Sequence, residues 1–89
     1  MKQNRHYREE YQIMSDIVYN IMNGQRKRTQ IMYSSRLSYS QLDYYLSLMD
    51  KRQLIQEHKD DIGARFYIVT ELGLELHTMI SRVKEIIGQ

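Results

Sequence analysis

The sequence predicts a mainly α-helical domain with one β-hairpin, an α+β fold in the order helix, helix, helix, strand, strand, helix. Three observations lead to this prediction. Apolar residues recur at helical spacing in the first half of the chain and again near its C-terminal end. Residues that commonly cap helices stand at the expected helix ends. Between these regions, two short runs of β-branched and aromatic residues flank a polar turn.

Length and composition limit the classes of protein to which the chain can belong. The 89 residues are expected to form a single domain over residues 1–89, because so short a chain cannot divide into two cores. The absence of cysteine excludes disulfide scaffolds and zinc fingers and fits a reducing compartment. The apolar runs are too short to cross a bilayer, so we expect no membrane partner and a cytoplasmic location. The net charge of +2 is only mildly basic, so the distribution of charge has to indicate the partner.

The N-terminal part of the chain predicts a helix after a polar segment. Residues 1–8 are polar and basic and are expected to be flexible. A helix is predicted over residues 9–22, with Gly24 as the left-handed residue that closes it. Thr29 is then expected to cap a short helix that ends near Ser34. The apolar stripe of the first helix consists of Ile13, Met14, Ile17, Val18, Ile21 and Met22.

A third helix is predicted over residues 38–51. Ser38 and Gln41 have the spacing of a capping box, in which each side chain satisfies a backbone N–H of the other residue. Apolar side chains then recur on one face, which is expected to be buried. This core face consists of Leu42, Tyr45, Leu46 and Met49.

The pattern then changes to that of a hairpin followed by a helix. Strands are predicted at residues 54–58 and 64–69, joined by a turn over residues 59–63. Thr70 is expected to cap a last helix that runs to Ile87. A short helix, a turn and a capped helix form a helix-turn-helix candidate, and a hairpin directly after them is the wing of a winged helix.

The stretch from Arg28 to Gly73 resembles small archaeal winged-helix DNA-binding proteins, which include transcriptional regulators and chromatin-type proteins. The residues that carry the resemblance are Arg28, Thr29, Ile31, Met32, Tyr33, Leu37, Ser38, Tyr39, Tyr45, Leu54, Ile55, Tyr67, Thr70 and Gly73. The resemblance implies that the third helix enters the major groove and that the last helix forms an antiparallel dimer. Chromatin-type members carry a longer last helix and a shorter wing, so these two departures favour a regulator.

Basic and polar side chains around the helix-turn-helix are the candidate DNA contacts. Residues 26–28 form a basic triplet before the short helix, where backbone N–H groups also attract phosphate, although such a triplet is also compatible with a solvated loop. The polar face of the third helix lies opposite its core face. The predicted DNA-binding residues are Arg26, Lys27, Arg28, Thr29, Arg36, Ser38, Ser40, Gln41, Tyr44, Ser47, Lys51, Lys59 and Arg65.

Some residues near this set are expected to contribute little or to oppose binding. Tyr39 is expected to be half-buried rather than a base contact. Asp43 would repel phosphate unless it meets a cytosine amino group or a neighbouring cation. In the wing, Arg65 is the better candidate for a DNA contact. Asp60 and Asp61 at the wing tip carry negative charge and oppose such a contact.

The apolar pattern of the last helix predicts a homodimer. Its apolar residues follow a heptad-like seam with a second line beside it, which is more apolar surface than a lone surface helix needs. The alternative is a wide apolar face that is buried entirely within one chain. The predicted dimer interface consists of Leu72, Leu76, Met79, Ile80, Val83, Ile86 and Ile87.

The function predicted from these patterns is a homodimeric transcriptional regulator that binds double-stranded DNA, which would associate it with the nucleoid. His6, His58 and His77 lack metal-ligand spacing, and no phosphate loop or nucleophile–base pair is apparent, so neither an enzyme nor a cofactor is expected. Two alternatives remain open. An architectural chromatin protein would bind DNA without sequence preference, and a protein-interaction module would use the same fold without touching DNA.

Overall fold

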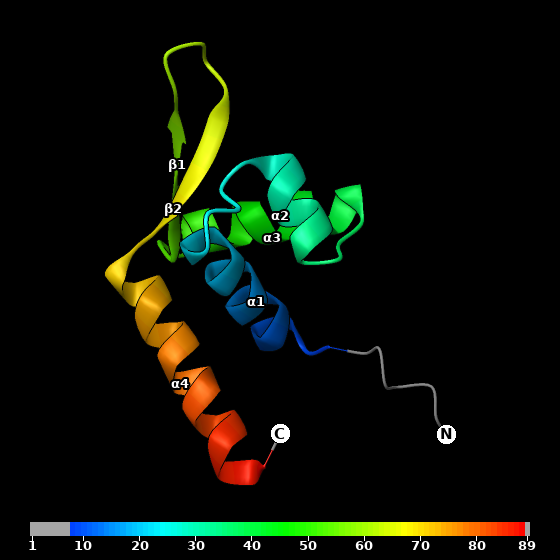
Figure 1. The fold of residues 1–89 in the computed structure, drawn as a ribbon, viewed down its shortest axis with the longest axis vertical. Coiled ribbons are helices and arrows are strands. Elements are labelled where there is room, and N and C mark those ends of the chain that lie inside the picture. Colours follow the sequence, from blue (N-terminus) through cyan, green and yellow to red (C-terminus); the bar gives the residue numbers. More distant parts are fainter. Residues whose placement is uncertain (1–7, 89) are drawn as a thin grey trace.

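The computed structural model describes residues 8–88 and has the predicted order of elements (Figure 1). The elements are α1 (Glu10–Met22), α2 (Arg28–Ser34), α3 (Tyr39–Lys51), β1 (Ile55–Lys59), β2 (Arg65–Val69) and α4 (Glu71–Ile87). The first three helices lie together, the hairpin projects from them, and α4 runs from the base of the hairpin along α1 (Figure 1). The predicted α+β winged-helix class is confirmed.

One hydrophobic core joins the helices to the base of the hairpin. The buried residues of this core are Ile13, Ile17, Val18, Ile21, Ile31, Leu37, Leu42, Tyr45, Leu46, Met49, Leu54, Ile55 and Tyr67. The predicted core face of α3 is therefore confirmed. On α1, Met22 departs from the predicted stripe and is exposed, because it is the last residue of the helix.

The N-terminal segment differs in part from its prediction. Residues 1–7, including His6, lie outside the described residues, so the expected flexibility is untested there. For Arg8, the expectation of flexibility is wrong. The Arg8 guanidinium donates to the Asp16 carboxylate at 2.8 Å and to the Ser35 carbonyl at 2.7 Å. These bonds fasten the start of α1 to the turn between α2 and α3.

Helix capping explains where the helices begin. The capping box of α3 is confirmed, because the Ser38 hydroxyl accepts from the Gln41 N–H and the Gln41 side chain accepts from the Ser38 N–H. The predicted Thr29 cap is wrong, since α2 already begins at Arg28. The Gln30 side chain accepts from the N–H of Lys27 at 3.1 Å, so the capping acceptor comes from inside the helix.

The hairpin pairs in a register that runs from Ile55 opposite Val69 to Lys59 opposite Arg65. Both strands begin one residue later than predicted, although Leu54 lies in the core and its carbonyl accepts from the Thr70 N–H at 3.1 Å just before the ladder begins. The segment before α2 adds a short third pairing, in which the Tyr67 N–H donates to the Arg26 carbonyl at 2.9 Å. This pairing attaches the wing to the start of α2.

α4 begins where the hairpin meets the helices. The Thr70 hydroxyl accepts from the Gly73 N–H at 3.0 Å and donates to the Gln53 carbonyl at 2.6 Å. Gly73 lies so close to the main chain that a Cβ atom at this position would overlap the Leu54 carbonyl oxygen. The Thr70 hydroxyl bonds and the close approach of Gly73 to Leu54 thus fix the angle at which α4 leaves the hairpin.

Candidate nucleic-acid interface

Two hollows adjoin the wing and the start of α2, and α3 lines one of them. The first, of about 220 Å³, lies between α3 and the wing strands. Its lining includes Arg28, Asp43, Ser47, Asp50, Lys51, Glu57, Arg65 and Tyr67. The second, of about 340 Å³, lies between the start of α2 and the wing and includes Arg26, Lys27, Gln30, Asp60 and Phe66. We call these two hollows and their rims the wing face.

The wing face brings together part of the predicted DNA-binding set. The predicted residues that line its hollows are Arg26, Lys27, Arg28, Ser47, Lys51 and Arg65. Lys59 pairs with Arg65 across the two strands and is exposed. Thr29 and Ser40 are exposed as well, although neither lines a hollow of this face.

Other predicted residues are turned away from the wing face. Gln41 and Arg36 line a separate hollow with Arg8, near the start of α1. The side chains of Ser38 and Gln41 are engaged in the capping box. The Tyr44 hydroxyl donates to the Glu10 carboxylate at 3.3 Å, which directs Tyr44 toward α1.

Arg28 is the least accessible of the predicted phosphate-binding residues. Its guanidinium donates to the Tyr67 hydroxyl and to the Asp43 carboxylate, both at 3.2 Å, and its side chain is 19% exposed. Burial would lower the pKa of this guanidinium, but the bonds to Tyr67 and Asp43 outweigh that effect and leave the pKa raised. Burial raises the pKa of the Tyr67 phenol, which in turn donates to Glu57. Arg28 therefore connects α2, α3 and the wing.

The turn of the wing is held by one of its two aspartates. The Asp60 carboxylate accepts from the N–H groups of Ile62 and Ala64 and pairs with the Lys27 ammonium at 3.2 Å. The Ala64 N–H and the Lys27 ammonium lower the pKa of the Asp60 carboxyl. The acidic tip thus has a structural role that its sequence position alone does not indicate.

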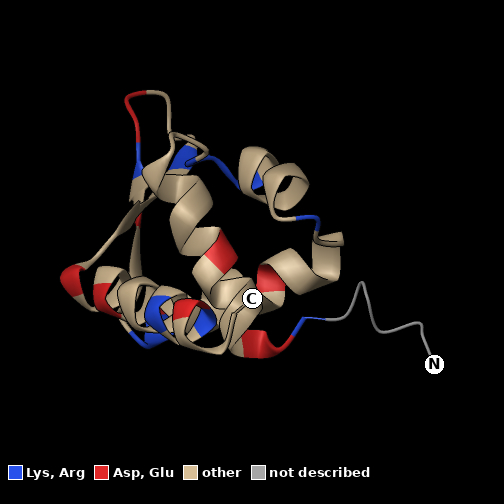
Figure 2. Ribbon diagram, turned by 60° about the horizontal axis from the view of Figure 1, so that its bottom comes forward, with Lys and Arg blue, Asp and Glu red and all other residues tan. Residues whose placement is uncertain are grey.

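Several cations of the wing face form ion pairs with neighbouring carboxylates. Lys27, Arg28 and Arg65 each pair with a carboxylate, the last with Glu57 at 3.5 Å. Among residues 8–88, Arg26 and Lys51 have no such ion pair, and Arg26 lies over the Phe66 ring, 5.9 Å from its centroid. In Figure 2 the acidic turn of the wing stands next to basic positions.

Of three features of this surface, one was misjudged from the sequence, one was left open and one was missed. Tyr39 is 71% exposed, so the half-buried placement was wrong: the first residue of α3 lies beyond the end of the core. Asp43 does meet a neighbouring cation, which is Arg28. Glu57 was not singled out, because its contact with Tyr67 depends on strand register.

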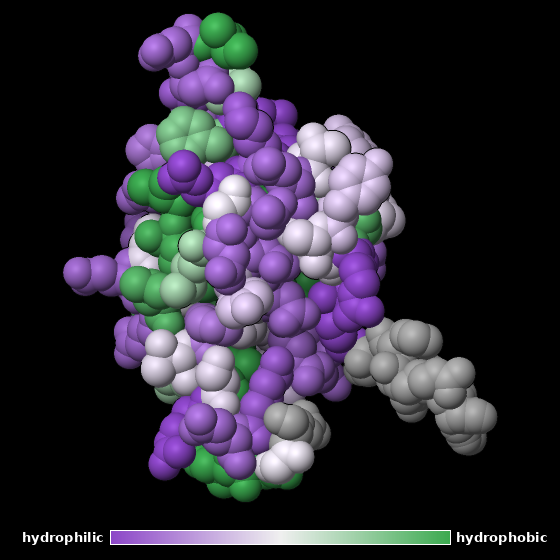
Figure 3. Space-filling view, viewed as in Figure 1, coloured by the Kyte–Doolittle hydropathy of each residue, from purple (hydrophilic) through white to green (hydrophobic). Residues whose placement is uncertain are grey.

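The predicted dimer residues lie on two sides of α4, an inner side that faces the rest of the chain and an outer side that is exposed. Ile80 is 8% exposed and Leu76 packs against the core, because both face the rest of the chain. Ile80 is therefore removed from the predicted interface. The remaining residues, Leu72, Met79, Val83, Ile86 and Ile87, are 49–68% exposed. Apolar side chains are visible along this edge and at the C-terminal end of α4 (Figure 3).

The histidines in the described part of the chain have structural contacts. His77 Nδ1 lies 2.7 Å from the Ser15 hydroxyl, which joins α4 to α1, and His58 stacks on Phe66. Within residues 8–88, no three His, Cys, Asp or Glu side chains are grouped so that they could hold a metal ion. None of the helices in this range has the length and hydropathy needed to span a membrane.

Comparisons with known proteins agree on the fold. The sequence matches the winged helix-turn-helix family over residues 7–88. An uncharacterized protein of Methanocaldococcus jannaschii is 26% identical over 86 residues, which are 96% of this chain and 84% of that protein. The structure of Sso10a-2, a DNA-binding protein from Sulfolobus solfataricus, is similar with a TM-score of 0.78 and 24% identity, covering 91% of this chain and 83% of that one. MepR, a transcription regulator of the Staphylococcus aureus multidrug efflux pump MepA, gives a TM-score of 0.77 at 14% identity, over 91% and 60% of the two chains.

Proposed function

Because the chain belongs to the winged helix-turn-helix family, we propose that it is a transcriptional regulator that binds double-stranded DNA as a homodimer. The observation that carries the proposal is the wing face, where Arg28 of α2, the second half of α3 and the wing strands line one hollow, and the wing and the start of α2 line the other. A major groove about 12 Å wide admits one helix, so α3 can enter it while the two flanking elements reach the backbones.

The proposed contacts follow from exposure and chemistry. Ser40 and Ser47 lie on the exposed side of α3 and present hydroxyl groups to base edges. The cations that would bind phosphate are Arg26, Lys27, Lys51, Lys59 and Arg65. Arg28 acts by holding the wing to the two helices, since its guanidinium is already bonded to Tyr67 and Asp43.

The internal ion pairs favour a regulator over an architectural protein. Binding without sequence preference depends on cations that neutralise phosphate. Here Lys27 and Arg65 are paired with carboxylates, so phosphate has to displace these partners. These ion pairs weaken binding to arbitrary DNA and leave a larger share of the affinity to base contacts. Failure to bind any duplex at low salt would instead support a protein-interaction module.

Substituting Asp43→Asn is expected to increase affinity for a random duplex about fivefold, since one unit charge about 4 Å away contributes about 1 kcal/mol in water. The change removes a carboxylate beside Arg28, while the Tyr67 hydroxyl still orients the guanidinium. Fluorescence anisotropy with a labelled duplex measures the effect. Glu85→Gln changes the net charge equally on α4 and is the control. Unchanged binding by Asp43→Asn would show that the wing face does not meet phosphate.

Replacing Arg26 and Lys27 with alanine is expected to weaken binding to every duplex alike. Each lost phosphate contact should reduce the slope of log affinity against log salt by about 0.9. Arg28 is left intact in this variant because it holds the wing. Lys84→Ala, which removes a cation from α4, should leave the slope unchanged. A double variant that binds like the unmodified chain at all salt concentrations would refute the phosphate assignment.

A further inference from the structure

Tyr39, the first residue of α3, is 71% exposed and is not among the DNA contacts proposed above. Within residues 8–88, its phenol has no hydrogen-bond partner and its ring has no aromatic partner. Such a ring gains free energy when a partner covers it. Single exposed apolar side chains are common on protein surfaces, so the position of Tyr39 has to indicate the partner.

Tyr39 continues the wing face toward the N-terminal end of α3. Tyr39, Asp43 and Ser47 are spaced four residues apart, so each lies about 40° from the next and the three follow one edge of the helix. Asp43 and Ser47 line the hollow between α3 and the wing strands. In a helix-turn-helix, the N-terminal residues of the second helix contact base edges. DNA that covers the wing face would therefore pass over Tyr39.

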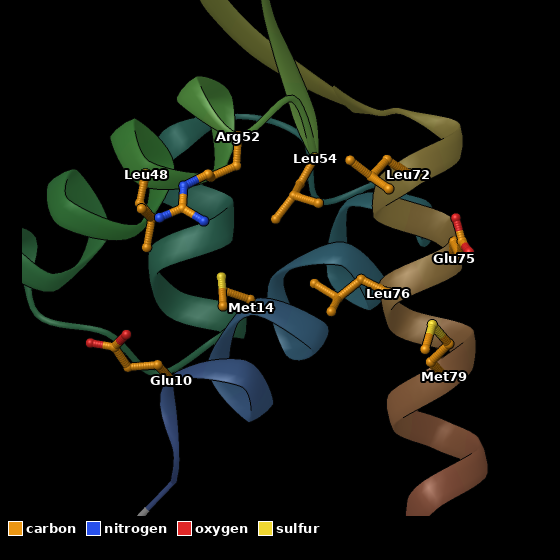
Figure 4. Close-up of a pocket in the computed structure, with 9 residues that line it drawn as sticks. All are labelled: Glu10, Met14, Leu48, Arg52, Leu54, Leu72, Glu75, Leu76 and Met79. Atoms are coloured by element: carbon orange, nitrogen blue, oxygen red, sulfur yellow. The ribbon is translucent and has the colours of Figure 1, made fainter.

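The opposite side of α3 is directed toward α1 and α4. Leu48, about 180° from Tyr39 by helical angle, points into an apolar groove of about 510 Å³ between α1, α3 and α4 (Figure 4). On the Tyr39 side, Asp43 instead pairs with Arg28 of α2 at 3.2 Å. The two sides of α3 thus have different neighbours, and Tyr39 lies on the side that faces α2 and the wing.

The main chain that carries Tyr39 is held in place by bonds from α1 and from α3 itself. In the turn before α3, the Ser35 carbonyl accepts from the Arg8 guanidinium at 2.7 Å, and the Ser35 hydroxyl accepts from the Asn20 amide at 3.0 Å. The capping box of Ser38 then fixes the first turn of the helix. Because this backbone is already ordered, a contact through Tyr39 costs only the side-chain freedom of one tyrosine.

The chemistry of the Tyr39 ring distinguishes one base from the others. In the major groove thymine presents a methyl group, whereas the other bases present only hydrogen-bond donors and acceptors. An aromatic ring gains free energy by covering the methyl group, but it would leave polar base edges without a partner. We propose that Tyr39 covers thymine methyl groups in the major groove and gives the protein a preference for A·T base pairs there, an inference that rests on the proposed binding of double-stranded DNA.

Replacing thymine by uracil tests the contact, because uracil lacks only the methyl group. Fluorescence anisotropy at low salt compares a duplex of alternating dA and dT with the same duplex carrying dU in place of every dT. The unmodified chain is expected to bind the dT duplex about fourfold more tightly for each methyl group that it covers, from the usual transfer free energy of such a group. Equal affinity for the two duplexes would overturn the proposal and leave DNA binding intact. Binding to neither duplex would refute the proposed function together with it.

Variants of Tyr39 assign the preference to its ring. Tyr39→Ala is expected to bind the two duplexes equally, whereas Tyr39→Phe keeps the ring and should retain the preference. Tyr19→Ala is the control and should discriminate like the unmodified chain, since Tyr19 is 55% exposed and contacts His77 of α4. Thermal unfolding checks that all three variants fold. A folded Tyr39→Ala chain that still prefers the dT duplex, or a Tyr39→Phe chain that has lost the preference, would contradict the proposal.

Photocrosslinking locates the contact without any substitution in the protein. A duplex with 5-iodouracil in place of thymine carries iodine at the position of the methyl group and, on irradiation, crosslinks to an aromatic ring in contact with it. Mass spectrometry of the digested complex is expected to find the crosslink at Tyr39. Tyr33 and Tyr44 are exposed as well and serve as internal comparisons. Crosslinks at these tyrosines but none at Tyr39 would overturn the assignment.

Discussion

Met79→Glu and Val83→Glu are each expected to convert the protein to a monomer and to reduce DNA affinity a hundredfold or more. Both side chains lie on the outer side of α4, with exposed fractions of 59% and 50%, so a carboxylate there would be buried without a partner at the proposed interface. Two linked DNA-binding faces gain about 10²–10⁴ in overall affinity over one, and a monomer loses this gain. Sedimentation velocity and anisotropy on the same samples measure both effects.

A charge on the opposite side of α4 separates the interface effect from a general effect of charge. Ser81→Glu places the same carboxylate about 160° from Val83 by helical angle and should leave the dimer and its DNA affinity unchanged. A clean 10.8 kDa species for the unmodified chain at micromolar concentration would show that α4 does not form the interface.

Gly73→Ala is expected to destabilise the fold by about 3 kcal/mol, at the upper end of the usual cost of overpacking. The new methyl group would overlap the Leu54 carbonyl oxygen, which is main chain and can move only if the start of β1 or α4 moves with it. Since 1 kcal/mol shifts the Tm of a domain this small by about 4–8 °C, thermal unfolding should show a loss of more than 10 °C.

Helix propensity makes the opposite prediction for the same change. Alanine is favoured over glycine by about 1 kcal/mol inside an exposed helix, so an unhindered Gly73→Ala would raise the Tm. Thr78→Ala, at an exposed position of the same helix, should change stability by no more than about 0.5 kcal/mol. A Tm for Gly73→Ala at or above that of the unmodified chain would contradict the close approach of α4 to Leu54.

The parts of the fold that depend on local chemistry could be predicted from the sequence. The Ser38 capping box and the Thr70 cap are confirmed, because each is decided by side chains within three residues of a helix start. The start of α2 was placed at the wrong residue, since the acceptor at its N-terminus is the Gln30 side chain rather than Thr29. The pairing of the Arg26 segment with β2 could not be anticipated, because it joins residues about 40 positions apart.

The candidate site was predictable as a set of residue types but not as an arrangement. Angles on one helix identified Ser40, Ser47 and Lys51 as exposed, and the structure agrees. Helical angles could not show that Arg28 is bonded to Tyr67 or that Tyr44 turns toward α1. Both contacts depend on how other elements pack against these helices. The ion pairs of the wing face likewise become apparent only when strand register and helix packing are combined.

The most direct test of the proposed function is a titration of the isotopically labelled chain with double-stranded DNA at low salt, followed by amide chemical shifts. The shifts are expected to concentrate on the exposed side of α3 around Ser40 and Ser47, on the start of α2 at Arg26 and Lys27, and on the wing around Arg65. An absence of shifts at low salt, or shifts confined to residues outside the wing face, would contradict DNA binding by this surface.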